Sequence, residues 1–284
     1  MHSANVCLIP ACSGRPEMGR RRTIACIIGA IFLLLPASAF AGAWTLPKGE
    51  GEIIVTATPS QATKGFDENG KLYSVPRYIK TDLQALIEYG ITDYFTLIVT
   101  PSLQHAAFGA PIDSQRSGFG YTDFGGRLRV WSNDAWVFSL QSLARLPGTS
   151  NTLNPAAVGY TDPEIDFRGL LGYSFKAGTW PAFVDAQIGQ RFRFGAPPNE
   201  IRADFTFGVR PAPQWLVLVQ SFNVISVGEG TGGNNPQYAY HKLQLSAVYA
   251  LTPTLSVQLG GFETVAGHNA FRERGLILGV WSKF

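Results

Sequence analysis

Charged and apolar side chains alternate between Asp162 and Arg210, and this pattern constrains the fold more than any other feature of the chain. The alternation runs through three consecutive stretches, 164–175, 184–194 and 201–210. In the first stretch, for example, Asp166 and Arg168 flank Phe167. A period of two residues is that of a β-strand, because successive side chains of a strand point to opposite faces. We therefore predict three long strands that share one charged face and one apolar face.

The start of the chain has the pattern of a bacterial secretory signal. Arg20–Arg22 precede an apolar run from Ile24 to Leu35, and small residues stand just before Gly42. The run is too short to span a bilayer, and small residues at these positions fit a peptidase that cleaves before Gly42. The three arginines leave the twin-arginine export route open as a lesser alternative, and translation starts at Met1 or at Met18. We predict that this N-terminal signal exports the protein and is then removed.

The predicted mature chain, residues 42–284, differs in composition from the whole sequence. Of 23 Lys and Arg and 20 Asp and Glu, 4 Arg and 1 Glu lie in the signal peptide, residues 1–41, so 19 of each sign remain. A neutral chain has no excess of positive charge with which to release counterions from nucleic acid, and we predict no nucleic-acid partner. All three cysteines precede residue 42, which removes disulfides and thiol chemistry from the mature chain.

Alternating stretches recur along the mature chain, and we count twelve. They cover residues 52–58, 78–90, 94–108, 123–130, 136–146, 164–175, 184–194, 201–210, 214–227, 239–251, 254–266 and 271–284. The ninth alternates poorly between Val217 and Phe222, so we predict a bulge or a change of register there. An even number of strands returns both termini to the same side of a barrel.

The connections between these stretches are of two lengths. Short ones, at 92–93, 132–134, 176–179, 211–213 and 251–254, take turns with connections that are mostly longer and rich in Gly, Asn, Asp and Pro, at 64–77, 109–119, 148–160 and 228–238. Short turns on one rim and long loops on the other are typical of outer-membrane barrels. The six tryptophans stand beside the short turns, the C-terminus or the first strand, and we predict that they form one interfacial girdle.

The same alternation occurs in a soluble β-sandwich or a lipocalin-like barrel, in which the apolar face points inward. Strand length, the two lengths of connection and the tryptophan rim favour the membrane barrel, because a tilted crossing needs about ten residues. We therefore predict an all-β fold, a transmembrane antiparallel β-barrel of about 12 strands. It is expected in the outer membrane of a Gram-negative bacterium, with its apolar face against lipid.

The last strand ends in an aromatic residue, Phe284, and Leu276, Leu278 and Val280 share its face. A terminal aromatic on an amphipathic strand resembles the signal by which the barrel-assembly machinery recognises outer-membrane proteins. We therefore predict this machinery as a partner of the C-terminal strand.

Two Gly-rich turns that lead through an aspartate into a strand resemble a known family. These turns open the segments Gly118–Arg129 and Gly159–Phe175, and the loose pattern recurs over most of residues 43–284. The chain resembles a family of outer-membrane β-barrel transporters named for operons of the phenol meta-cleavage pathway. The resemblance implies an outer-membrane barrel with a transport role. It implies no substrate, because no binding motif defines the family.

Some membrane barrels are enzymes, but the sequence gives little support for catalysis. None of His105, His241 and His268 stands two residues from a serine, as in the His-x-Ser of outer-membrane phospholipases and lipid A deacylases. Catalytic partners can be remote in sequence, so a membrane-embedded hydrolase remains a minor alternative. We predict these histidines to be polar residues near loops or rims. No ligand cluster for a metal is evident, and we predict no catalytic residue, metal or cofactor.

The charged face is the one group of residues that points to a function. Its candidates for lining a pore are Arg127, Arg129, Asp166, Arg168, Asp185, Arg191, Arg193, Arg202, Asp204 and Arg210. Such residues either line a water-filled constriction that filters solutes by charge, or pair as salt bridges that fill the lumen and stabilise the barrel. The sequence leaves both interpretations open.

We predict a passive channel or facilitator for small solutes, with anionic and aromatic molecules as the candidate classes. On the three stretches first described, arginines outnumber Asp166, Asp185 and Asp204, and Glu164 reduces the excess. A net positive wall of guanidinium groups would favour anions. No plug domain precedes Glu52, which argues against energy-coupled uptake. The chief alternative is a non-conducting structural or export-associated barrel.

Overall fold

The computed structural model describes residues 42–148, 162–231 and 235–284, and these residues form strands and connections. The predicted signal peptide therefore lies outside the described residues. In chain order the strands are β1 (Gly51–Phe66), β2 (Leu72–Thr92), β3 (Phe95–Thr100), β4 (Ser102–Phe108), β5 (Ser114–Phe119), β6 (Thr122–Ser132), β7 (Trp136–Leu146), β8 (Glu164–Ala177), β9 (Trp180–Arg193), β10 (Glu200–Ala212), β11 (Trp215–Ser226), β12 (Ala239–Ala250), β13 (Leu255–His268), β14 (Ala270–Phe271) and β15 (Arg274–Lys283). The described part of the chain has no helix long and apolar enough to cross a membrane.

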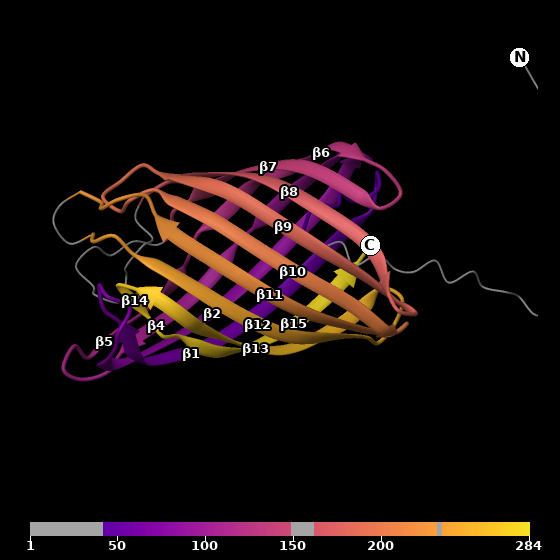
Figure 1. The fold of residues 1–284 in the computed structure, drawn as a ribbon. Coiled ribbons are helices and arrows are strands. Elements are labelled where there is room, and N and C mark those ends of the chain that lie inside the picture. The colour runs from indigo at the N-terminus through magenta and orange to yellow at the C-terminus, as the bar shows by residue number, and fades with distance from the viewer. Residues whose placement is uncertain (1–41, 149–161, 232–234) are drawn as a thin grey trace, which may run out of the picture. The chain divides into compact units, whose positions relative to one another are not determined.

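The strands form one antiparallel sheet that closes on itself (Figure 1). The first strand, β1, pairs with β2 on one side and with β15 on the other, so the sheet has no free edge along this seam. Three of the barrel strands are each divided into two labelled strands. They are β3 with β4, which Pro101 separates, β5 with β6, and β14 with β15. The result is a closed barrel of 12 strands, which confirms the predicted fold class.

Several strands are longer than the sequence analysis predicted. Because β1 extends to Phe66 and β2 begins at Leu72, the connection expected at 64–77 is a turn of residues 67–71. The connection expected at 109–119 likewise contains β5. The one expected at 148–160 lies almost wholly outside the described residues. These strand extensions are rich in polar residues, which is why their alternation was missed.

Between Val217 and Phe222 the ninth predicted strand has no bulge, so the prediction was wrong there; the register shift of the β10–β11 pair lies just before it, between Val209 and Ala212 opposite Trp215 and Val217. From Val217 to Ile225, β11 pairs with both of its neighbours without a change of register. Its alternation looks weak because two polar residues, Ser221 and Asn223, lie on the outward face of β11 among apolar residues. The Asn223 side chain donates a hydrogen bond to the Ala203 carbonyl at 2.7 Å, which satisfies its amide on that face.

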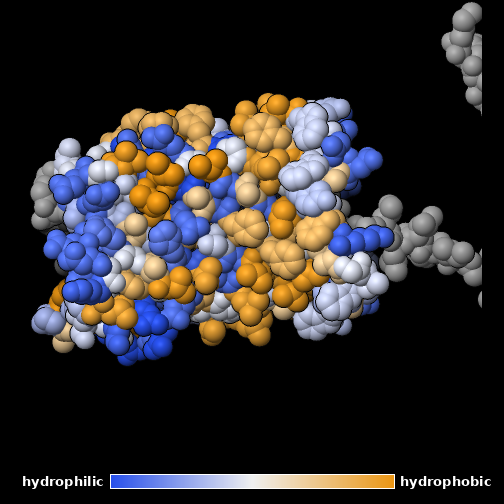
Figure 2. Space-filling view, viewed as in Figure 1, coloured by the Kyte–Doolittle hydropathy of each residue, from blue (hydrophilic) through white to orange (hydrophobic). Residues whose placement is uncertain are grey.

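The outer surface carries the apolar face of the strands. Phe167, Ile188 and Leu259 are 50–64% exposed, and Figure 2 shows apolar side chains around the middle of the barrel, with hydrophilic ones gathered toward one end. An apolar exterior around a polar interior is the arrangement that lipid requires of a membrane barrel.

The predicted girdle holds for four of the six tryptophans. The exposed ones are Trp131, Trp136, Trp180 and Trp215, all beside short turns. The other two were assigned wrongly. Trp281 is 8% exposed and packs inside the barrel against Leu216 and Val248, because it has the inward parity of its strand. Trp44 enters the lumen with the segment described below.

Candidate functional site

Ten ionic side chains form one connected network on the lumen side of β6–β10, which we call the ionic wall. Its members are Asp123, Arg145, Glu164, Asp166, Arg168, Arg191, Arg193, Glu200, Arg202 and Asp204. The central links are short: Arg168 lies 2.6 Å from both Asp166 and Asp204, and Arg191 lies 3.0 Å from Asp166. Asp166 is only 1% exposed.

Strand register explains this network. Glu164 faces Arg193 and Asp166 faces Arg191 across the β8–β9 ladder, so opposite charges stand side by side on the lumen face. Directly opposed side chains on one face of an antiparallel pair are close enough to form ion pairs. The alternation of charged residues in the sequence therefore becomes a lattice of paired charges.

The ionic wall is electrically balanced, which corrects the predicted excess of arginine. The eighth predicted strand, 201–210, begins one residue late and leaves out Glu200, whose carboxylate lies 3.1 Å from Arg202 and 3.4 Å from Arg193. Glu200 also accepts a hydrogen bond from the Tyr238 hydroxyl. With Glu200 included, five arginines face five carboxylates in the network. The positive wall on which an anion preference was based is therefore neutral.

The first described residues, Gly42–Lys48, lie across the lumen, and we call them the N-terminal segment. The Ala43 N–H donates to Asp185 at 2.7 Å, and the Ser139 hydroxyl donates to the Ala43 carbonyl at 2.5 Å. Arg127 donates to the Trp44 carbonyl at 2.8 Å. The N-terminal segment is therefore hydrogen-bonded to β6, β7 and β9, and its residues Ala43, Thr45 and Leu46 are buried within the barrel.

Two further contacts fix the other end of the N-terminal segment. Thr96 accepts a hydrogen bond from the Leu46 N–H at 2.8 Å, and Gly90 accepts one from the Gly49 N–H at 2.8 Å. A Cβ on Gly90 would lie 2.0 Å from the Pro47 carbonyl oxygen, so only glycine permits this approach. These few residues therefore narrow the lumen at the short-turn end.

The opposite side of the lumen is lined mainly by uncharged side chains, and we call it the glutamine wall. Gln220 on β11 accepts a hydrogen bond from Gln244 on β12 at 2.9 Å. Gln258 on β13 donates to Ser246 at 2.9 Å and accepts from Trp281 at 3.0 Å. Toward the short turns this wall becomes apolar, with Leu216, Leu218, Val248 and Trp281 in one cluster.

A hollow of about 170 Å³ lies in the lumen beside the glutamine wall. Gln84, Gln244 and Phe262 are among its lining residues. Its two cations are paired, since Lys80 lies 3.5 Å from Asp82 and Lys242 lies 3.0 Å from Glu273. Lys242 also stands 4.3 Å above the centre of the Phe262 ring. The hollow thus combines an aromatic side chain, amide groups and two lysine–carboxylate pairs.

The structure brings six of the ten predicted pore-lining residues into the ionic wall: Asp166, Arg168, Arg191, Arg193, Arg202 and Asp204. Arg127 pairs instead with Glu88 at 2.8 Å, and Asp185 receives the N-terminal segment. Arg129 lies over the Tyr94 ring at 5.0 Å. Arg210 has no ion pair with any residue that the structure describes. That these ten residues line a conducting path stays a prediction.

Two histidines lie on the outer face, each with a polar partner from the neighbouring strand. His105 Nδ1 is 2.8 Å from the Ser117 hydroxyl, and His241 Nδ1 is 2.8 Å from the Asn223 side-chain oxygen. Strand pairing creates both contacts, so no local sequence motif could have found them. Among the described residues no group of three or more His, Cys, Asp or Glu is arranged to hold a metal ion.

Together, the closed sheet, the apolar exterior and the polar lumen define an outer-membrane β-barrel. The chain belongs to the family described as "Putative MetA-pathway of phenol degradation", whose model matches residues 71–279. No curated protein sequence matches the chain.

Solved structures share the fold at low sequence identity. An outer membrane channel from Pseudomonas putida F1 matches with a TM-score of 0.70 and 16% identity, over 85% of this chain and 98% of that one. The transport unit of the autotransporter AIDA-I from Escherichia coli matches with a TM-score of 0.51 and 10% identity, over 88% and 95%. The KdgM porin in complex with disordered oligogalacturonate matches with a TM-score of 0.48 and 11% identity, over 82% and 99%.

Proposed function

We propose that the protein is a passive channel for small solutes across the outer membrane, and that solutes pass beside the glutamine wall. The observation that carries this proposal is the lumen hollow lined by Gln244, Phe262 and Lys242. The charges of the ionic wall are paired with one another, although buried atoms such as Glu164 Oε2 and Arg202 Nε lack a hydrogen bond, and the N-terminal segment fills the space beside β6, β7 and β9. The name of the similar Pseudomonas putida F1 protein, an outer membrane channel, supports the same function.

The chemistry of the hollow favours small aromatic solutes with an anionic or polar substituent. Gln84 and Gln244 offer hydrogen bonds, and Lys242, which lies between the Phe262 ring and Glu273, offers an ammonium group that an anionic substituent would share with that carboxylate. Anionic and aromatic solutes were the two classes expected from the sequence, and here one molecule would use both properties. Transport of this kind needs no catalytic residue or cofactor.

The two alternative functions that the sequence leaves open have less support. A non-conducting or export-associated barrel gains some support from the AIDA-I transport unit, which has a similar fold. A lipid-facing hydrolase would have to use a pair such as His105 and Ser117, which lacks a carboxylate partner among the described hydrogen bonds. Neither function explains the hollow beside the glutamine wall.

Single-channel recording on the purified full-length protein in a planar bilayer tests the proposal. We expect a small, steady conductance and uptake of benzoate-like solutes into liposomes that contain the protein. Replacement of Phe262 by Ala should change the uptake of aromatic solutes more than the conductance of chloride. A folded barrel that shows neither conductance nor solute uptake would overturn the channel.

Export and assembly are part of the proposal. The signal peptide over residues 1–41 would direct the chain to the outer membrane, and the C-terminal strand would be recognised by the barrel-assembly machinery. In the folded barrel the ring of Phe284 is 61% exposed and stacks on Tyr89 with ring centres 6.5 Å apart. The strand pairs with β1, where Lys283 faces Glu52, so it closes the barrel once assembly is complete.

A further inference from the structure

Four cationic side chains gather on the outer face of the barrel where β1, β2 and β15 approach the rim of longer connections. We call them the basic cluster: Lys64, Arg77, Arg272 and Arg274. Lys64, Arg77 and Arg274 are exposed, and among the described residues none of these three has an acidic partner within ion-pair distance. Arg272 is held by Glu263, with 2.8 Å between guanidinium nitrogen and carboxylate oxygen.

The register of the strands places the basic cluster on the lipid side of the wall. Gln61 pairs with Arg274 on one side and with Ile79 on the other, so these three side chains form one row across β15, β1 and β2. Two residues after Arg274, on the same face, Leu276 is 54% exposed, and Leu278 follows at 45%. The cluster therefore stands at the edge of the apolar belt, where lipid headgroups meet acyl chains.

Among the residues that the structure describes, the strand ends on the ionic-wall side lack such a cluster. At the same rim, β8, β9 and β10 have apolar outward residues at their ends, namely Ile165, Phe192 and Ile201. If these cations served only to keep the rim soluble, cations would also be expected at the ends of β8, β9 and β10, where the outward residues are apolar. The asymmetry points to a ligand with negative charge.

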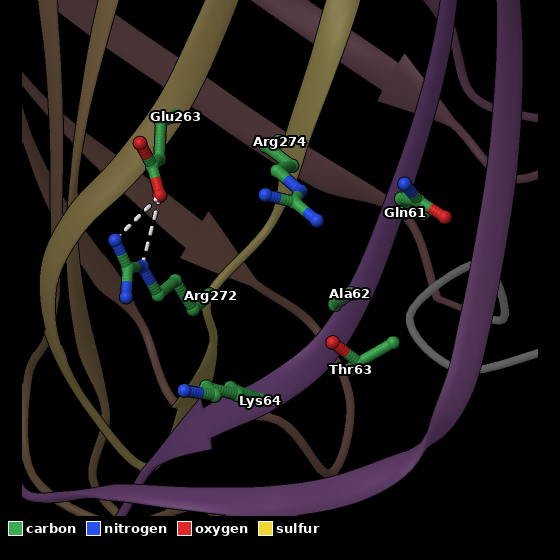
Figure 3. Close-up of a pocket in the computed structure, with 7 residues that line it drawn as sticks. All are labelled: Gln61, Ala62, Thr63, Lys64, Glu263, Arg272 and Arg274. Atoms are coloured by element: carbon green, nitrogen blue, oxygen red, sulfur yellow. Dashed lines mark hydrogen bonds and ion pairs between the residues drawn. The ribbon is translucent and has the colours of Figure 1, made fainter.

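Two adjoining hollows give the basic cluster the shape of a site. The first, about 230 Å³, is lined by Lys64, Arg272 and Arg274, and Figure 3 shows these side chains around one opening, beside the Arg272–Glu263 pair. The second, about 460 Å³, is lined by Arg77 and Arg274 together with apolar residues such as Ile79 and Leu276. Arg274 and Gln61 border both hollows. A ligand that fills both would be anionic at one end and apolar at the other.

We propose that the basic cluster binds the phosphate groups of a glycolipid in the outer leaflet, with an acyl chain of the same molecule against Ile79 and Leu276. Guanidinium groups bind phosphate oxygens in a bidentate fork, which makes such bonds strong and directional. Basic pockets at the headgroup level of membrane proteins recognise lipid phosphates in this way. The proposal depends on the barrel lying in the outer membrane and not on whether the lumen conducts.

Binding of a bisphosphorylated glycolipid to the purified full-length barrel in detergent tests the proposal, with native mass spectrometry as the readout. The wild-type barrel should retain this lipid and should bind a dephosphorylated analogue with the same acyl chains far more weakly. The double change Arg77→Gln with Arg274→Gln should weaken binding about 30-fold, because each cation at a membrane surface contributes about 1 kcal/mol and 1.4 kcal/mol is tenfold. Arg77→Lys with Arg274→Lys keeps the charge and loses the fork, so it should show a smaller loss.

The matched control removes two exposed cations outside the basic cluster, Lys71→Gln in the β1–β2 turn and Lys176→Gln at the short-turn end, and should leave binding unchanged. Because the changed side chains are exposed, each variant is expected to fold. Heat-modifiable migration on gels checks this. Equal binding of the phosphorylated and dephosphorylated lipids would overturn the site. So would equal losses in the glutamine and control variants, or displacement of the lipid by inorganic phosphate alone. Binding of phosphatidylglycerol as tight as that of the glycolipid would overturn the assignment to a glycolipid.

Discussion

The two sides of the lumen are built from different chemistry although they belong to one sheet. The ionic wall on β6–β10 holds five arginines and five carboxylates that pair with one another, and Asp166 at its centre is almost fully buried. The glutamine wall on β11–β13 and β15 uses neutral amides, as in the pair Gln220–Gln244, above an apolar cluster. A hollow of about 170 Å³ in the lumen adjoins the glutamine wall.

This difference shows that charge in a lumen does not by itself mark a solute path. Buried ions need partners, because an unpaired charge in a region of low dielectric costs several kcal/mol. Once paired and buried, as Asp166, Arg191 and Glu200 are, they present little polar surface to a solute. A wall of neutral amides and aromatic rings costs less to leave partly open, so a path beside it can accept solutes that are only weakly charged.

The largest effect is expected from breaking the ionic wall. Replacement of Asp166 by Asn leaves Arg168 and Arg191 without one of their carboxylates and should lower the free energy of unfolding by about 3–5 kcal/mol. Unfolding in detergent, followed by gel migration over a urea series, measures the loss.

The matched change on the other wall replaces both partners of a neutral pair, Gln220→Leu with Gln244→Leu. It should cost about 1 kcal/mol, because removing both members leaves neither amide unsatisfied, and only the Thr206 hydroxyl loses the 3.2 Å hydrogen bond that Gln220 donates to it. If this double variant were as unstable as Asp166→Asn, the proposed contrast between the walls would be wrong.

A smaller loss of stability is expected from a change in the N-terminal segment, which packs against the ionic-wall side of the lumen. Trp44 packs edge-on against Phe183 with ring centres 5.5 Å apart. Trp44→Ala should destabilise the barrel by about 2–3 kcal/mol, less than for a fully buried aromatic, and should raise the single-channel conductance because the constriction widens. Trp180→Ala, the same change on the exposed rim, should leave conductance unaltered. Equal conductance in all three proteins would show that the segment does not limit the path.

A third prediction compares one cation from each side. Lys242→Gln removes a charge from the hollow, and Arg202→Gln removes one from the ionic wall. A charge about 7 Å from a passing ion in water is worth about 0.6 kcal/mol, so Lys242→Gln should lower relative anion permeability roughly threefold. Reversal potentials under a salt gradient measure the change. A larger shift with Arg202→Gln would place the path along the ionic wall and would favour the pore-lining residues predicted from the sequence.

The barrel and its ionic face could be predicted because strand periodicity is local. Alternation through Asp166 and Arg168 identifies strands and groups the charges on one face, whatever their partners are. The N-terminal segment could not be predicted in this way, since its contacts with Asp185 and Ser139 span 142 and 96 residues. Glu200 was missed because it is the first residue of its strand, and element boundaries are the least certain part of a sequence pattern.

The smallest effect concerns an exposed carboxylate outside both walls. Asp67, in the β1–β2 turn, accepts hydrogen bonds from the N–H groups of Lys71 and Asn69 at 2.8 Å, and these bonds hold the pKa of its carboxyl below the ordinary value of 3.8. A carboxyl with a lowered pKa in the folded state stabilises the fold above its unfolded pKa, and this contribution disappears as the pH falls through the folded pKa. Asp67→Ala should therefore lower the unfolding temperature slightly at neutral pH and not at all in strong acid, whereas Asp67→Asn, which keeps an acceptor oxygen, should lower it less. Thermal unfolding at pH 7 and pH 2 measures both differences. A loss as large as that of Asp166→Asn would mean that burial is not what makes the ionic wall costly to break.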